Sequence, residues 1–270
     1  MRTSSCLSER ALQFSPVAHK NPDAAELTAR RPSAAMVAAA SGGVTSAQSV
    51  EAVAACLAGY AKSELAAYLV SLLSDEQALM RTAIASYVHA NGFYKLVLET
   101  SDRHKLRLHV WMPGLHAAEH IHEHRWFFAS TVLMGELHAE TYQEDATSAA
   151  QVFDEYVYFG KAGASESKRE FVGKTKLLCS RCSVRKSGDT YVMAPTVLHR
   201  IVRTDATLTA TLVFQTAPAR PHNRLLTLPD AAPDVLQVPL STAEVAHVIR
   251  QVISNLRTPT QTGKQEALCI

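Results

Sequence analysis

One stretch, from Trp111 to Tyr142, constrains what this chain can fold into more than any other. It contains five of the chain's twelve histidines, and three of these, His120, His122 and His124, occupy every second position. Successive side chains of a β-strand point to opposite faces, so these three imidazoles would share one face of an extended strand. Gly135 then provides a turn into a second alternating segment. Three imidazoles that point the same way predict a metal site, because imidazole is a common ligand of transition metals.

Alternating segments separated by turn signals also surround this stretch. Roughly eight short strands at this spacing predict an all-β core, built as an antiparallel sandwich or barrel. Outside the histidine stretch, strands are expected at Tyr94–Thr100, Lys105–Met112, Val152–Phe159, Lys174–Cys179, Thr190–Ala194, His199–Arg203 and Thr207–Gln215.

The regions before and after the strands have a different character. Residues 1–45 are rich in Ala, Ser and Arg and predict a disordered leader, with a faint likeness to an organelle transit peptide that its acidic residues weaken. Residues 46–92 predict two or three helices that cap the barrel, with starts at Ser63-Glu64 and Ser74-Asp75-Glu76. The barrel itself is expected over 93–220.

A C-terminal extension is expected over 221–270. It is rich in proline at its start and then predicts a helix near Thr242–Leu256. The residues Ser241-Thr-Ala-Glu244 fit a capping box, in which the serine and the glutamate each bond the other's backbone N–H group.

Composition excludes several function classes. A net charge of +2 gives no reason to expect nucleic acid or an anionic membrane as a partner, and no apolar run approaches the roughly 20 residues of a membrane span. Five scattered cysteines argue against a disulfide framework and for a reducing, cytoplasmic location. Cys179-x-x-Cys182 is half a zinc site, interpreted as two reduced thiols. The basic run Lys168–Lys186 is interpreted as a solvated hairpin.

Two separated motifs resemble those of the cupin superfamily. The first is H-x-H on a strand, followed by Gly135; the second is Gly188-Asp189, then Pro195, then His199 on the next strand. In cupins these motifs lie on facing strands of a jelly-roll barrel and converge on one metal ion. The resemblance therefore implies a cupin barrel with an N-terminal helical cap and a C-terminal helix.

The register leaves two ligand sets open. Counting back from Gly135 makes His122 and His124 the H-x-H ligands, whereas counting forward from Gly114 makes them His120 and His122. We favour His122 and His124 with His199, and keep His120 as runner-up. The glutamate of the cupin motif would fall at Phe128, which is no ligand.

A three-histidine site narrows the resemblance to the cysteine dioxygenase type of cupin, over roughly residues 46–220. Ile121-His-Glu-His resembles its I-H-D-H, Leu133-Met-Gly-Glu-Leu its L-x-G-x-L, and Leu198-His-Arg-Ile its L-H-R-V. The resemblance implies a mononuclear Fe(II) oxygenase, an oxidoreductase that acts with O₂ on a small anionic substrate. Three neutral ligands would leave the ion's full charge to attract such a substrate. The alternatives are a non-catalytic ligand-binding cupin and a redox-neutral cupin isomerase.

Three further positions are catalytic candidates through the same resemblance. The oxygen-positioning tyrosine of the family corresponds to Gln215, and its carboxylate-binding arginine falls near Lys95 or Leu96, after Tyr94. Tyr94, Lys95 and Gln215 are therefore the predicted catalytic residues. Lys95 would act as a point charge rather than as a bidentate fork.

One rival motif overlaps the same stretch. His116-Ala-Ala-Glu119-His120 fits the inverted zincin pattern H-x-x-E-H, which needs a helix across these residues. The aromatic and β-branched residues that follow favour a strand. His138, on the next predicted strand, is interpreted as a residue outside the site.

Overall fold

The computed structural model describes residues 47–114, 119–159, 168–202, 207–229 and 237–257, together with Met36 and Ala38. The helices are α2 (Ala47–Ser63), α3 (Leu65–Ser74), α4 (Glu76–Ala85) and, after the strands, α5 (Thr242–Arg257). The strands are β1 (Tyr87–His89), β2 (Phe93–Thr100), β3 (His104–Trp111), β4 (Ile121–His122), β5 (Phe128–Met134), β6 (Glu136–Glu144), β7 (Gln151–Phe159), β8 (Lys168–Lys186), β9 (Thr190–Met193), β10 (Leu198–Val202), β11 (Thr209–Thr216), β12 (Asn223–Thr227) and β13 (Val238–Pro239).

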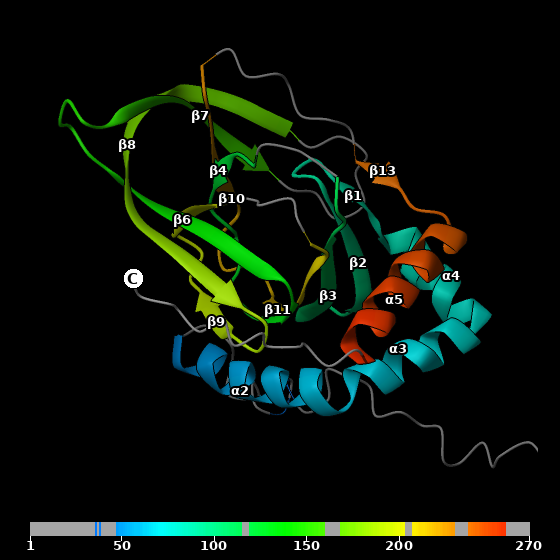
Figure 1. The fold of residues 1–270 in the computed structure, drawn as a ribbon. Coiled ribbons are helices and arrows are strands. Elements are labelled where there is room, and N and C mark those ends of the chain that lie inside the picture. The colour runs from blue at the N-terminus through cyan, green and yellow to red at the C-terminus, as the bar shows by residue number, and fades with distance from the viewer. Residues whose placement is uncertain are drawn as a thin grey trace, which may run out of the picture.

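The strands form two antiparallel sheets. Sheet A has seven strands in the order β13-β1-β2-β3-β11-β5-β9. Sheet B, in the order β10-β4-β12-β7-β8-β6, closes on itself as a barrel. The long strands β7 and β8 curve away from the rest of the molecule (Figure 1). This architecture confirms the predicted all-β core with helices before and after it.

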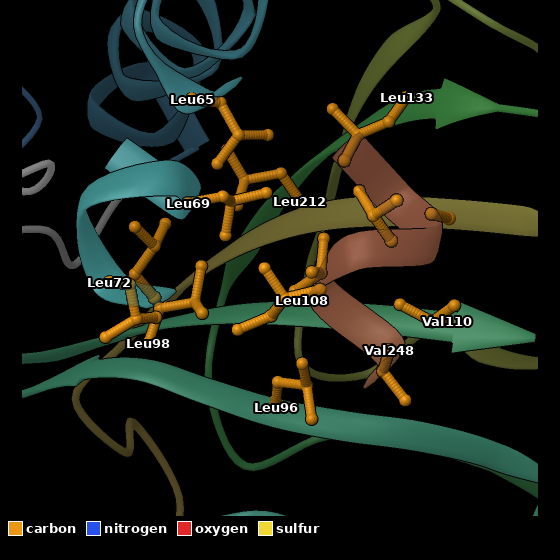
Figure 2. Close-up of a cluster of buried hydrophobic side chains, with 14 of the residues drawn as sticks. Leu65, Leu69, Leu72, Leu96, Leu98, Leu108, Val110, Leu133, Leu212 and Val248 are labelled. Atoms are coloured by element: carbon orange, nitrogen blue, oxygen red, sulfur yellow. The ribbon is translucent and has the colours of Figure 1, made fainter. Parts of the chain in front are cut away.

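The helices cover one face of sheet A (Figure 1). Leu65, Leu69 and Leu72 recur at helical spacing along one side of α3 and pack with Leu96 of β2 and Leu108 of β3 (Figure 2). Each fully buried leucine contributes about 1.5–3 kcal/mol through the hydrophobic effect. This layer fixes which face of sheet A is apolar, so the odd-numbered side chains of β3 must face the other way, toward sheet B.

The predicted helix starts agree with the structure. The Asp75 carboxylate accepts a hydrogen bond from the Ala78 N–H (2.9 Å) at the start of α4. At α5 the Ser241 hydroxyl accepts from the Glu244 N–H (3.2 Å), while the Ser241 N–H donates to the Glu244 carboxylate (2.7 Å). The predicted capping box is therefore present.

The basic run Lys168–Lys186 is a single strand, so its prediction as a hairpin is wrong. The N-terminal half of β8 pairs with β7 and the C-terminal half pairs with β6. Two β-bulges interrupt these ladders, one beside Gly173, so the strand bends without turning back. Strands β1, β12 and β13 also join the sheets, although they lie outside 93–220.

The predicted leader falls almost wholly outside the described residues. Within it, Met36 is fully buried in the helix–sheet core. In the described part of the chain no single helix has the length and apolarity to cross a membrane; α2 and α3 pass that test only as a pair, bent by 64°.

Candidate metal centre

Three histidines from two neighbouring strands and one adjoining segment meet between the sheets. His199 on β10 lies directly opposite His122 on β4. His124 follows two residues after His122, beyond the end of β4, and its backbone N–H donates to the Pro195 carbonyl (3.1 Å). One ring nitrogen of each of the three lies within 4.8 Å of the others, which is close enough for one metal ion.

The orientation of two rings is fixed by backbone carbonyls. His122 Nδ1 lies 2.9 Å from the His120 carbonyl, and His199 Nδ1 lies 2.9 Å from the Val197 carbonyl. A carbonyl oxygen only accepts hydrogen bonds, so both Nδ1 atoms carry a proton and Nε2 is the nitrogen left to bind a metal ion in each ring. This arrangement is common for metal-binding histidines.

Two of the three rings, His199 and His124, are held in their neutral form. Burial lowers the pKa of His199 to about 3, and the neighbouring His122 acts in the same direction. Burial also lowers the pKa of His124 well below 6.5, with His122 and His199 as the next causes. Because only the neutral imidazole can bind a metal ion, both rings are in the ligand form at neutral pH.

The donor set fits a transition metal with open coordination positions. The ring centroids lie 4.7–5.0 Å apart, with the His122 and His124 planes perpendicular. Among the described residues, no carboxylate belongs to this group. His122, His124 and His199 could therefore hold such an ion through three neutral nitrogens and leave positions free for other ligands.

Aromatic side chains border the three histidines. Trp126 stacks on His124 at 5.6 Å, and Phe128 on β5 meets the same ring edge-on at 5.0 Å. Phe128 stands where the cupin motif has its glutamate. Its ring is 6.5 Å from that of His199, so this position contributes an apolar wall and no ligand.

The face of sheet A that looks toward the histidines carries buried basic side chains. Lys95 on β2 and Arg107 on β3 are both buried, and the Arg107 guanidinium lies 5.3 Å from the Trp126 ring. Both side chains contribute to lowering the pKa of His124, while burial lowers the pKa of Lys95 itself well below 10.5. Within the described segments neither basic side chain has an ion-pair partner, and Arg107 Nε is buried without a hydrogen bond. Arg107 was not predicted from the sequence.

Two more polar atoms on this face have no partner in the part of the chain that the structure describes. Gln215 on β11 is buried, and its Oε1 atom accepts no hydrogen bond; His109 Nε2 on β3 is likewise unpaired. An unpaired buried polar group costs about 1–3 kcal/mol, which a ligand that pairs with it would recover. Gln215 and Lys95 thus lie on the face where their predicted roles require them, and those roles stay predictions.

Tyr94 does not lie with the histidines. It precedes Lys95 on β2, so its side chain points to the opposite face of sheet A and packs against the helix-side core. This placement gives no support to its predicted catalytic role, which stays a prediction. His120, the runner-up ligand, is outside the ligand group and contributes its backbone carbonyl to His122.

The acidic residues of this stretch have structural partners. Glu123 is buried and pairs with Arg220 (2.8 Å), while Glu119 accepts hydrogen bonds from Asn91 (2.5 Å) and from the Ile201 backbone. Glu119 and His120 lie outside any helix, which contradicts the end of the zincin pattern; His116 lies outside the described residues.

His138 on β6 also stays outside the histidine group. Its Nε2 lies 3.5 Å from a Glu136 carboxylate oxygen. That agrees with its interpretation as a residue outside the site.

Comparison with known proteins gives little further information. No protein-family model matches the chain, and no curated protein matches it. Among solved structures it is similar to the crystal structure of a cupin-like protein (tm1010) from Thermotoga maritima, at 15% identity and a TM-score of 0.22, over 58% of this chain and 84% of that chain. A TM-score this low gives no support to a shared fold. The description of this chain therefore rests on the strand order and the histidine geometry. They define two antiparallel sheets, one of them a closed barrel, with helices before and after the strands and a candidate three-histidine metal centre.

Proposed function

We propose that the chain is a mononuclear non-haem iron oxygenase of the cysteine-dioxygenase-like cupin type, acting with O₂ on a small anionic substrate. The observation that supports this most is the convergence of three imidazoles without a described carboxylate. Fe(II) held by three protein ligands activates O₂ and keeps positions open for substrate. Other metals bind imidazole too, so the choice of iron rests on the family resemblance.

The buried basic side chains support an anionic substrate. Arg107 presents positive charge toward the histidine cluster, and burial lowers the pKa of the neighbouring Lys95 well below 10.5, so a bound anion would favour its charged form. No described carboxylate pairs with either side chain. Burying an unpaired charge is costly, so a protein gains stability when a bound anion pairs with it. Arg107 would hold a carboxylate through its planar guanidinium, and Lys95 would add a point charge.

A thiol acid fits this surface best. Its carboxylate would pair with Arg107 or Lys95, its sulfur would face the three histidines, and Gln215 Oε1 would accept a hydrogen bond from a neighbouring amine or hydroxyl. Phe128 and Trp126 would exclude water from the reacting atoms. In the net reaction the thiolate takes up both atoms of O₂ and becomes a sulfinate.

The test is oxygen consumption by protein loaded with Fe(II) under anaerobic conditions. A panel of small thiol acids is supplied, and the product is analysed for a mass gain of two oxygen atoms. We expect turnover with at least one member and its loss in His122→Ala and His199→Ala, while His138→Ala keeps it. Turnover without oxygen would favour an isomerase, and specific binding without turnover would favour a binding module; either result contradicts the proposal.

A further inference from the structure

Cys179 and Cys182 lie on the same face of β8, which their spacing alone would not predict. Residues three apart on a regular strand point to opposite faces. Here a β-bulge intervenes: Cys179 is opposite Tyr142, and Cys182 is opposite Glu140, with Ser180 as the extra residue. The Ser180 hydroxyl donates to the Thr141 carbonyl (3.1 Å), which holds the bulge in place. The two sulfur atoms consequently lie 3.7 Å apart.

A third potential ligand comes from the neighbouring strand. A Glu140 carboxylate oxygen and both sulfur atoms lie within 4.8 Å of one another. The carboxylate is held in position because its Oε2 accepts hydrogen bonds from the Tyr142 hydroxyl (2.5 Å) and from Arg200 Nε (2.6 Å). Such oriented carboxylates are typical of metal ligands. Glu140 could not be predicted from the sequence as a partner of the two cysteines. It is about 40 positions away from them along the chain and becomes their neighbour only through strand pairing.

We propose that Cys179, Cys182 and Glu140 form a second metal site, for a thiophilic divalent cation such as Zn²⁺, with water as the fourth ligand. Tetrahedral zinc with Zn–S bonds of about 2.3 Å places two thiolate sulfurs about 3.8 Å apart, close to the separation found here. Two thiolates and one carboxylate carry three negative charges, which the cation and the Arg200 guanidinium together neutralise.

This site is separate from the histidine centre. β6 lies between β8 and β10 in sheet B, and Thr141 pairs with Arg181 on one side and with His199 on the other. Glu140 and Arg200 are neighbours of Thr141 and His199 along their strands, so their side chains point to the opposite face of the sheet. A cation here would clamp β6 to β8 beside the strand that carries His199. The proposal stands whether or not the chain is an oxygenase.

Cobalt substitution tests the site directly. Co²⁺ bound to thiolates gives an intense near-ultraviolet charge-transfer band, whereas a site made of histidines gives none. We expect the full chain, kept reduced, to show this band with one equivalent of Co²⁺. The control variants His122→Ala and Cys56→Ser should keep the band. The site variants Cys179→Ser and Cys182→Ser should lose it. Zn²⁺ should abolish the band by displacing cobalt.

The hydrogen bond to the proposed carboxylate ligand supplies a finer test. Tyr142→Phe keeps the ring, which packs against a buried apolar cluster of sheet B, but removes the hydroxyl, and should weaken Zn²⁺ binding about 10–100-fold. A triple variant, Cys6→Ser, Cys56→Ser and Cys269→Ser, leaves only the proposed pair and should bind as the parent does. Absence of the band, a band that survives Cys179→Ser, or its loss in the triple variant would each overturn the proposal.

Discussion

Replacing Arg107 by methionine should make the metal-free, substrate-free protein more stable. Burial lowers the pKa of this guanidinium to about 10, with Tyr87 opposing and Arg125 adding to the shift. Each pKa unit corresponds to about 1.4 kcal/mol, so the charged form is disfavoured by about 3 kcal/mol in the folded state. Methionine loses the contact of the guanidinium with Trp126, worth about 0.5–2 kcal/mol. The net gain should be about 1–3 kcal/mol.

Urea unfolding at neutral pH measures this gain as a shift in the midpoint at constant slope. Arg103→Met, at an exposed position in the turn before β3, serves as the control and should change little. A carboxylate ligand should raise the unfolding midpoint of the parent, whereas the same ligand should not raise that of Arg107→Met. A variant less stable than the parent would refute the reasoning, because it would show that the charge of Arg107 is already paired.

Three further predictions concern the fold. Gly135→Ala should lower the free energy of unfolding, measured in urea, by about 1–3 kcal/mol more than Gly188→Ala does. Both glycines have positive φ, but a Cβ at Gly135 would lie 2.9 Å from the Thr209 Cα, whereas a Cβ at Gly188 would meet open space. Equal losses of stability would contradict this prediction. Burial lowers the pKa of His109 well below 6.5, so the unfolded state takes up a proton first and stability should fall as pH drops below about 6.5. That slope should flatten in His109→Gln, and an unchanged slope would exclude His109 as its source. Ser241→Ala should remove about 1 kcal/mol and expose the first-turn amides of α5 to hydrogen exchange, and unaltered exchange there would contradict the capping box.

The strands could be predicted because turn residues mark their ends. The hairpin of β2 and β3 is the clearest case, since Ser101-Asp102-Arg103 separates two alternating runs whose observed bounds differ by one residue from those expected. The histidine pair could be predicted for a related reason, because the alternation around His122 fixes a common face. Only the family resemblance brought His199 to it, as no local pattern encodes a contact between residues 77 positions apart.

The positions that the sequence could not predict are those that depend on what covers each face of sheet A. Arg107 alternates with Leu106 and Leu108, a pattern that normally means a solvent-facing charge. It is buried, and its guanidinium lies against Trp126 from the segment between β4 and β5. The position of Tyr94 could not be predicted for the same reason, since a shift of one residue moves a side chain to the other side of the sheet.

The most direct test of the three-histidine centre is iron content after anaerobic loading with Fe(II). It is best measured in a Cys179→Ser background, so that only the histidine centre is counted. We expect about one iron per chain in this background and in its His138→Ala variant, with loss of iron in His122→Ala and His199→Ala. If both of these last variants keep the full iron content, the metal is not held by these histidines and the proposed centre is wrong.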